Sequence, residues 1–460
     1  MSVHVFAGPT IPAARVCELL PAAHLHPPVR HGDLLRLQLA PGATVLIIDG
    51  LWHQSAPVRH KEILLLLSEG IAVVGAASMG ALRAAELGPF GMSGIGAVFR
   101  AFRDGVLDAD DEVAVVQGPD GQPLSHALVN LRTALHRAAG AGRITTAEAH
   151  ALAELAQALP YPRRSWRALA RAADGAGLRD AYGRANAWRR AHPWDQKRED
   201  AEEALCALYV RAPGPADTSG WGQEPWRTSF VRYWEAAHRP IPGTDVPFLA
   251  HLTHQQLYDA EFGARWRRRV LARIAETGTV REGSGAAEAA VGTAAEAGLT
   301  PDALSPVQLA HWLTPYERRS LDEREMLIRV MVRSARLDGA WTIWPTSPQD
   351  AGDLVNPELP TATEVAEAFR LNAATESANP LHSTAHLAPG RIAAHLLVRW
   401  HLAPDADRLV RDAAARDRAF RDFAGAVEAA RPFYLGAVAR TVANSSAGTV
   451  GDGASVNART

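Results

Sequence analysis

Two short apolar runs near the N-terminus constrain the fold most. Residues 44–49 (TVLIID) and 71–74 (IAVV) read as strands, and a helical segment at 58–68, closed by Gly70, lies between them. Strands that are apolar on both faces are typical of parallel sheets covered by helices. Strand–helix alternation at this spacing also fits the crossovers that a parallel sheet requires. An open parallel α/β sheet is therefore predicted.

The neighbouring segments extend this alternation to about residue 118. We predict a first strand at 3–6, a helix at 12–20 with a proline in its first turn, a helix at 78–87 and a fourth strand at 113–116. The predicted fold class is α/β, with an N-terminal Rossmann-like domain over residues 1–140.

Strand signals fade after about residue 120. Thr145 and Glu148 form a capping-box pattern at the start of a helix, and amphipathic stretches continue to residue 442. A mostly α-helical C-terminal region is predicted over residues 141–443, with a possible break near 277–298. The Ser/Gly/Asn-rich segment 444–460 is predicted to be a disordered tail.

The net charge and the cysteine content limit the cellular location and the partners that we expect for the protein. The net charge is −2, and no apolar run reaches the roughly 18–20 residues of a membrane span. The two cysteines, Cys17 and Cys206, are too few for a disulfide framework. A strand predicted from residue 3 leads us to expect no targeting segment. Tryptophans among arginines after residue 150 would suit a nucleic-acid surface, but helix faces with buried tryptophans are favoured at this charge. We expect a soluble cytoplasmic protein that binds neither nucleic acid nor membrane.

Lysine is almost absent from the chain. Of 48 Lys and Arg residues, only Lys61 and Lys197 are lysines. Arginine stays protonated at any working pH, whereas a desolvated lysine can lose its proton and act as a base. Lys61 lies in the first turn of a predicted helix, so it is a candidate base.

Several segments are expected to meet where the predicted parallel strands end. Ligands of open α/β sheets bind outside the carboxyl ends of the strands. The residues that follow three predicted strands, or begin the helices after them, are Gly8, Pro9, Thr10, Asp49, Lys61 and Ser78.

Ser78 occupies a strand–turn–helix segment, Gly75-Ala76-Ala77-Ser78-Met79-Gly80. The segment is similar to a nucleophile elbow, although Ala76 stands where that motif has its first glycine. A neutral Lys61 would activate the Ser78 hydroxyl, and the N–H groups of Met79 and Gly80 would bind the oxyanion. Alternatively, Ser78 simply caps the helix that follows.

Other motifs are weaker. Gly75 and Gly80 have the glycine spacing of a phosphate-binding loop, but Ala81-Leu82 replace its Lys-Ser/Thr. The pairs His24/His26 and His251/His254 lack a clear third metal ligand, and 110–112 (DDE) is more typical of a solvated turn than of a cation site. No cofactor and no metal are expected.

The chain resembles the TfuA-like family over about residues 3–132. The resemblance rests on 60–64 (HKEIL), 75–87 (GAASMGALRAAEL), 90–92 (FGM), 110–115 (DDEVAV) and 128–132 (LVNLR). One departure is Gln117, where the family pattern leads us to expect a histidine.

The resemblance implies a role in peptide backbone thioamidation. TfuA proteins act beside a YcaO-family enzyme, which activates a peptide amide with ATP. The resemblance further implies hydrolysis of a thiocarboxylated ThiS-type sulfur carrier by a Ser–Lys pair, here Ser78 and Lys61. His60, Glu62, Gly75 and Arg83 are expected to support the site or orient the substrate. The precursor peptide or protein would be reached through YcaO.

Two alternatives remain open. The protein could be a non-catalytic activator that docks YcaO, with Ser78 only a helix cap. It could instead be a nucleotide-binding Rossmann-like enzyme.

Overall fold

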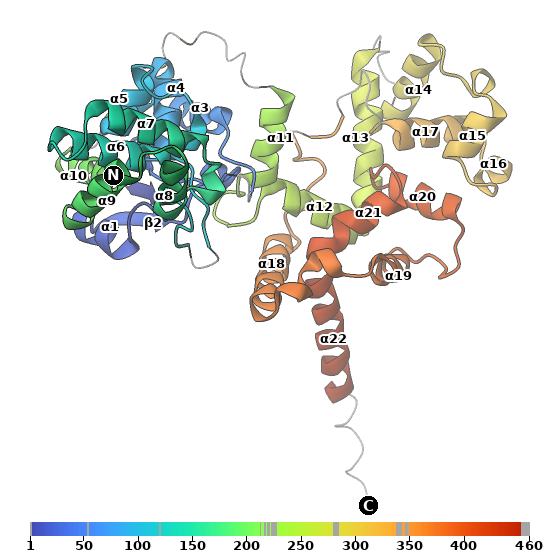
Figure 1. Ribbon diagram of the computed structural model, residues 1–460. Helices are drawn as coiled ribbons and strands as arrows, with labels where there is room; N and C mark the ends of the chain where they lie inside the picture. The colour runs from blue at the N-terminus through green and yellow to red at the C-terminus, as the bar shows by residue number, and fades with distance from the viewer. Residues whose placement is uncertain are drawn as a thin grey trace, which may run out of the picture. The chain divides into compact units, whose positions relative to one another are not determined.

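The computed structural model divides the chain into two compact units, Met1–Val231 and Arg232–Thr460 (Figure 1). The structure describes residues 2–52, 55–118, 121–211, 213–215, 218, 221, 228–278, 285–336, 343–345, 348 and 350–451.

The first unit is built on a parallel sheet of five strands. Its strands are β1 (Val3–Phe6), β2 (Ala23–His26), β3 (Thr44–Ile47), β4 (Ala72–Ala76) and β5 (Ser93–Ile95). Their order is β2-β1-β3-β4-β5, and every neighbouring pair is parallel. The central strands β3 and β4 are buried along their whole length, as their apolar sequences require.

Helices cover both faces of this sheet. On one face, Val45 and Ile47 pack against α3 (His60–Ser68) and α4 (Met79–Leu87). On the other face, Leu46 and Ile48 pack against α1 (Ala13–Leu19) and α10 (Gln196–Val210). The α/β unit thus includes a helix well beyond residue 140, where the sequence prediction placed the end of the first domain.

The remaining helices of this unit lie between β5 and α10 or beside the sheet. They are α2 (Asp33–Arg36), α5 (Ala97–Arg103), α6 (Leu128–Gly140), α7 (Thr146–Ala158), α8 (Trp166–Gly175) and α9 (Arg179–Ala191). Thr145 and Glu148 form the predicted capping box at the start of α7. Helices α6 to α9 share a core of leucine and alanine side chains.

The predicted fold class is confirmed: an N-terminal parallel sheet alternates with helices, and a largely helical region follows. One predicted strand is wrong, because 113–116 is irregular and β5 pairs with β4 instead. The ends of this segment bond to side chains and to turns rather than to a neighbouring strand of the sheet. The carbonyl of Val113 accepts from side chains, and the N–H of Val116 donates to Ser125 Oγ.

The second unit is helical. Its helices are α11 (Ser229–His238, across the division), α12 (Phe248–Tyr258), α13 (Phe262–Thr277), α14 (Ala286–Glu296), α15 (Pro306–Trp312), α16 (Glu317–Ser320), α17 (Glu323–Ser334), α18 (Thr361–Ala378), α19 (Pro389–Arg399), α20 (Arg408–Arg416), α21 (Phe423–Ala430) and α22 (Tyr434–Gly451). Helix α22 continues past residue 444, where the sequence prediction placed the start of the tail; residues 452–460 lie outside the described part. Among the described residues, no helix is long and apolar enough to cross a membrane.

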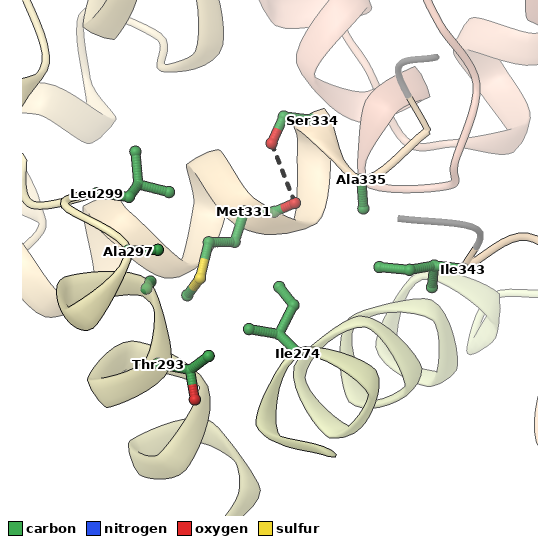
Figure 2. Close-up of a pocket in the computed structure, with 9 residues that line it drawn as sticks. Ile274, Thr293, Ala297, Leu299, Met331, Ser334, Ala335 and Ile343 are labelled. Atoms are coloured by element: carbon green, nitrogen blue, oxygen red, sulfur yellow. Dashed lines mark hydrogen bonds between the residues drawn. The ribbon is translucent and has the colours of Figure 1, made fainter. Parts of the chain in front are cut away.

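An apolar cavity of about 250 Å³ lies between α13, α14 and α17 (Figure 2). Its two hydroxyls are already engaged with main-chain carbonyls, Thr293 with Ala289 at 3.0 Å and Ser334 with Met331 at 3.3 Å. The other lining residues are Ile274, Ala294, Ala297, Leu299, Met331, Ala335 and Ile343.

Candidate active site

Ser78 follows a strained turn at the carboxyl end of β4. Ala77 has a positive φ of 64°, and the N–H of Ser78 donates to the carbonyl of Ala76 at 2.7 Å. A hydrogen bond spanning two residues across a positive φ is the pattern of the rarer γ-turn, which is strained. Such strain persists only where the surrounding structure holds it, and it clusters at functional sites.

The Ser78 hydroxyl does not cap α4. Ser78 occupies the N-cap position, but its side chain makes no capping hydrogen bond. The hydroxyl instead donates to the carbonyl of Val113 at 3.4 Å, and the residue is 3% exposed. The structure therefore contradicts the alternative in which Ser78 serves as the side-chain cap.

The two glycines beside Ser78 allow α4 to lie directly on the sheet. A Cβ on Gly80 would stand 1.7 Å from the carbonyl oxygen of Ile47, and one on Gly75 would stand 1.9 Å from that of Gly80. The N–H of Gly80 donates to the carbonyl of Ile48 at 3.3 Å. It is therefore not free to bind an oxyanion, contrary to the prediction from the sequence. Among the described residues, the Met79 N–H has no hydrogen-bond acceptor, so it can serve as such a donor.

Asp49 joins the ends of β1 and β3. Its carboxylate is buried and accepts the N–H of Gly8 at 2.9 Å, the N–H of Thr10 at 3.0 Å and the Thr10 hydroxyl at 2.6 Å. Pro9 lies between these two donors in the same half-buried loop. The segments that follow β1 and β3 thus meet at one edge of the sheet.

Lys197, in the first turn of α10, reaches the same edge. Its side chain is 4% exposed, and its Nζ lies 3.0 Å from the carbonyl oxygen of Val113. That carbonyl also accepts the Ser78 hydroxyl. Burial lowers the pKa of Lys197, although the carboxylates of Asp49, 4.0 Å away, and Asp195 oppose the change.

Residues 49–165 match the model of the TfuA-like protein family. This confirms the resemblance seen in the sequence over that segment. The TfuA-like segment contains Asp49, Lys61, Ser78 and Val113, whereas Thr10 and Lys197 lie outside the matched residues. No curated protein matches the chain.

Lys61, the base suggested by the sequence, is half-buried in the first turn of α3. Its side chain forms no hydrogen bond or ion pair with any residue that the structure describes, so no such bond connects it to Ser78. Its neighbour His60 contacts Glu86, with Nε2 2.8 Å from the carboxylate, and Arg83 donates to the same oxygen at 2.6 Å. Although burial opposes this, both contacts hold the pKa of Glu86 below its usual value.

Glu62 of the TfuA-like segment is fully buried and holds a loop. It accepts the N–H of Arg59 at 3.0 Å and that of Gly32 at 2.8 Å, and its carboxylate lies 2.6 Å from Nδ1 of His31. Burial raises the pKa of Glu62. These contacts fix the loop that precedes α2, so Glu62 supports the frame of the sheet.

The acidic motif 110–112 pairs with arginines. Asp111 lies 2.7 Å from the guanidinium of the fully buried Arg164, and Glu112 lies 2.9 Å from that of Arg132. Asn130 in the LVNLR motif accepts the N–H of Lys197 at 3.2 Å. The TfuA-like motifs therefore hold both the Val113 segment and the start of α10 in place.

Among described residues, the remaining sequence candidates form no hydrogen bond with Ser78. His4 joins His24 and His26, with its Nδ1 2.9 Å from Nε2 of His26 and a ring stacked on His24. In the part of the chain that the structure describes, no three His, Cys, Asp or Glu residues could hold a metal ion. Gln117 forms an antiparallel bridge with Pro123.

Sequence reasoning missed Lys197 as a site residue. The signal was present, because Lys197 is one of only two lysines, but its helix lies far along the chain from Ser78. Only the packing of α10 on the sheet brings the two residues to one carbonyl.

Proposed function

We propose that this protein releases sulfur from a thiocarboxylated ThiS-type sulfur carrier and supports a YcaO-family enzyme in peptide backbone thioamidation. The family match over residues 49–165 supports this proposal, because the resemblance to TfuA proteins implies that reaction class. The observation that carries the hydrolase assignment is Ser78: a buried serine after a strained turn, with its hydroxyl withheld from the helix cap. A hydroxyl held in one position before the substrate binds loses less entropy when it attacks.

The proposed reaction proceeds through an acyl-enzyme. Ser78 Oγ attacks the carbonyl carbon of the carrier's C-terminal thioacid, and a lysine amine takes the serine proton. The Met79 N–H stabilises the oxyanion. The C–S bond then breaks, and sulfide leaves with that proton. Water hydrolyses the resulting ester, which regenerates Ser78, so a thiocarboxylate and one water give a carboxylate and H₂S.

The surrounding residues have supporting roles in this proposal. Asp49, Gly8, Pro9 and Thr10 hold the edge of the sheet beside the serine. Gly75 lets α4 begin close to β4. In this proposal the partners are the carrier, a YcaO-family enzyme and the peptide that it modifies, and the setting is the cytoplasm.

His60, Arg83 and Glu86 form a polar cluster between α3 and α4. Arg83 is 8% exposed, and its Nε has no hydrogen-bond partner among the described residues. In this proposal the cluster orients the carrier's C-terminal segment, because a buried guanidinium N–H favours a carbonyl or carboxylate oxygen. Glu62 supports it indirectly by holding the loop beside the start of α3.

The two alternatives fit less well. A purely non-catalytic activator gives no reason for the strained turn or for the position of the Ser78 hydroxyl. A nucleotide site would need the glycine-rich loop to be open to phosphate. Here the space beside Gly75 and Gly80 is filled by main chain.

The deciding experiment measures sulfide release from a thiocarboxylated carrier protein by the full chain, without YcaO. We expect Ser78→Ala to lose roughly 10³-fold or more of the wild-type rate, because the nucleophile is removed. Ser68→Ala is the matched control, since Ser68 lies half-buried on α3 and donates only to the carbonyl of Leu65 at 2.8 Å. Equal rates for Ser78→Ala and wild type, or no release by folded wild type, would favour the activator.

A further inference from the structure

We propose that Lys197, rather than Lys61, is the base that accepts the proton of Ser78. This inference rests on the role of Ser78 in the proposed function and names the second member of its Ser–Lys pair. Its foundation is a shared contact: the Val113 carbonyl accepts both the Lys197 amine at 3.0 Å and the Ser78 hydroxyl at 3.4 Å.

The contacts of Lys197 fit a neutral amine better than an ammonium ion. An ammonium has three N–H donors, yet Lys197 Nζ makes one hydrogen bond to described residues, to an uncharged carbonyl. The Asp49 carboxylate stands 4.0 Å away, and its oxygens already accept Gly8 and Thr10. Burial in such surroundings disfavours the charged form, and the pKa of Lys197 is lowered accordingly.

The proton transfer begins with both side chains on the Val113 carbonyl. The Ser78 O–H turns from the Val113 carbonyl to the lone pair of Lys197 Nζ as Oγ bonds to the thioacid carbon. The new ammonium keeps its bond to Val113 and is stabilised by Asp49 and, more weakly, by Asp195. It returns the proton to the departing sulfur, which leaves the amine neutral for the second half of the reaction.

The helix that carries Lys197 is fixed in place, as a proton acceptor requires. The N–H of Lys197 donates to Asn130 Oδ1 at 3.2 Å. One turn later, Asp200 accepts the N–H of Val98 at 2.7 Å and the side chain of Gln196 at 2.7 Å. These bonds tie the first turns of α10 to α5 and α6.

A fluorophosphonate probe tests the inference without the carrier protein. The probe forms a covalent bond to an activated serine, and intact mass measures the rate of labelling. We expect Lys197→Met and Lys197→Arg to label roughly 10²-fold more slowly than wild type or worse, since general-base catalysis is lost. Lys61→Met and Lys61→Arg should stay within about threefold of wild type under the same principle. Loss in the Lys61 variants with retention in the Lys197 variants would overturn the proposal.

The pH profile separates a base from a structural lysine. Labelling should fall on the acid side as Lys197 becomes protonated. Asp49→Asn should shift this acid limb to lower pH, because the Asp49 charge raises the pKa of Lys197. An acid limb that stays in place in folded Asp49→Asn would count against Lys197. If wild type is labelled with this dependence but releases no sulfide from the carrier, the inference stands and the proposed substrate is wrong.

Discussion

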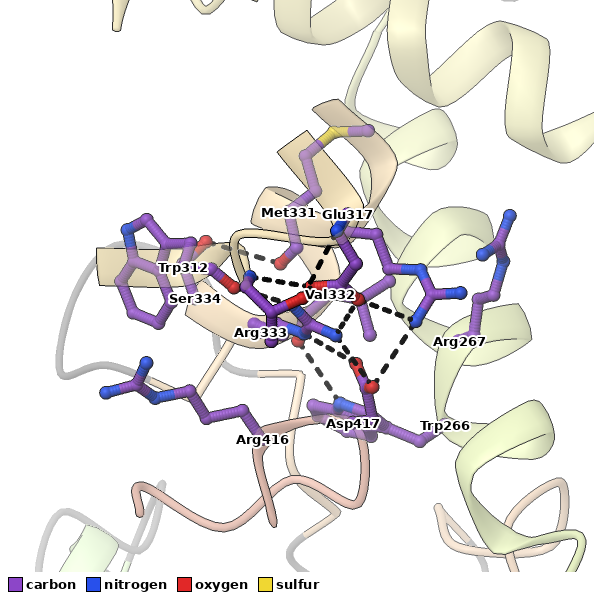
Figure 3. Close-up of polar contacts among 12 residues, drawn as sticks. Trp266, Arg267, Trp312, Glu317, Met331, Val332, Arg333, Ser334, Arg416 and Asp417 are labelled. Carbon is purple, nitrogen blue, oxygen red and sulfur yellow. Dashed lines mark hydrogen bonds and ion pairs between the residues drawn. The ribbon is translucent and has the colours of Figure 1, made fainter. Parts of the chain in front are cut away.

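Arg333 in the helical unit and Lys197 in the α/β unit are both buried basic side chains, but their hydrogen-bond partners differ. In the helical unit, the side chain of Arg333 is 1% exposed and donates to Asp417 at 2.8 Å, to Glu317 at 2.6 Å and to the carbonyl of Trp312 at 2.6 Å (Figure 3). In the α/β unit, Lys197 is 4% exposed and donates only to the Val113 carbonyl among described residues.

This difference in partners distinguishes a cation that stabilises the fold from an amine that can act as a base. The planar guanidinium fork of Arg333 engages two carboxylates at once. Although burial opposes it, those hydrogen bonds raise the pKa of Arg333, whereas burial prevails at Lys197 and lowers its pKa. A guanidinium paired with two carboxylates stabilises the fold and stays charged. A buried amine without such pairing can gain and lose a proton.

Breaking the Arg333 network should have the largest effect on stability. In Arg333→Met, Glu317 and Asp417 would lose a buried partner, so we expect the helical unit to lose about 3–5 kcal/mol. Arg273→Met is the matched control, because Arg273 is 44% exposed in its pair with Asp350 and should cost no more than about 1 kcal/mol. Urea titration followed by tryptophan fluorescence measures both; a similar small loss in each would show that the network adds little.

Protonation of Glu317, an acidic residue of the same network, should reduce stability by a somewhat smaller amount. Although burial opposes this, hydrogen bonds from Arg333 and Thr314 lower the pKa of Glu317 from 4.5 to about 2. Because the folded pKa lies below the unfolded one, this stabilisation is complete above pH 4.5. It is lost as the pH falls toward 2, on the order of 3 kcal/mol. The free energy of unfolding against pH tests this, and Glu317→Gln should flatten that part of the curve; an unchanged slope would contradict the assignment.

Local patterns explain why most of the sheet was predictable. The strands β3 and β4 are apolar on both faces, and that pattern is visible in four or five consecutive residues. The segment 113–116 is equally apolar, yet no local signal shows that the backbone groups of Val113 and Val116 bond to side chains. Conversely, β5 is Ser-Gly-Ile, a sequence with little strand propensity that pairs because β4 offers a free edge.

The residues of the candidate site also fall into two groups, those predictable from local sequence and those that depend on tertiary packing. Thr10, Asp49 and Ser78 each follow a strand, so the rule for parallel sheets was enough to bring them to one edge. Lys197 depends on the packing of a distant helix, which spacing cannot reveal. The capping-box glutamate of α3, Glu62, could be named from its motif, but its role in holding a neighbouring loop is tertiary.

Removing Lys197 should cost the least stability, which is the sharpest contrast with Arg333. Lys197→Met replaces a poorly paired buried amine by an apolar chain of similar length, so the α/β unit should lose no more than about 1 kcal/mol at neutral pH. It should gain stability wherever folding lowers the proton affinity of Lys197 in the wild type. The variant should also lose a pH dependence. Because the folded pKa of Lys197 lies below the unfolded 10.5, the unfolded chain binds an extra proton between the two values. Wild-type stability should therefore rise with pH across that interval and level off above it, whereas Lys197→Met should not. Denaturant titrations of both proteins from pH 7 to 10.5 measure this; a large loss in Lys197→Met, or a wild-type curve that falls, would mean that Lys197 is held as a structural ammonium like Arg333.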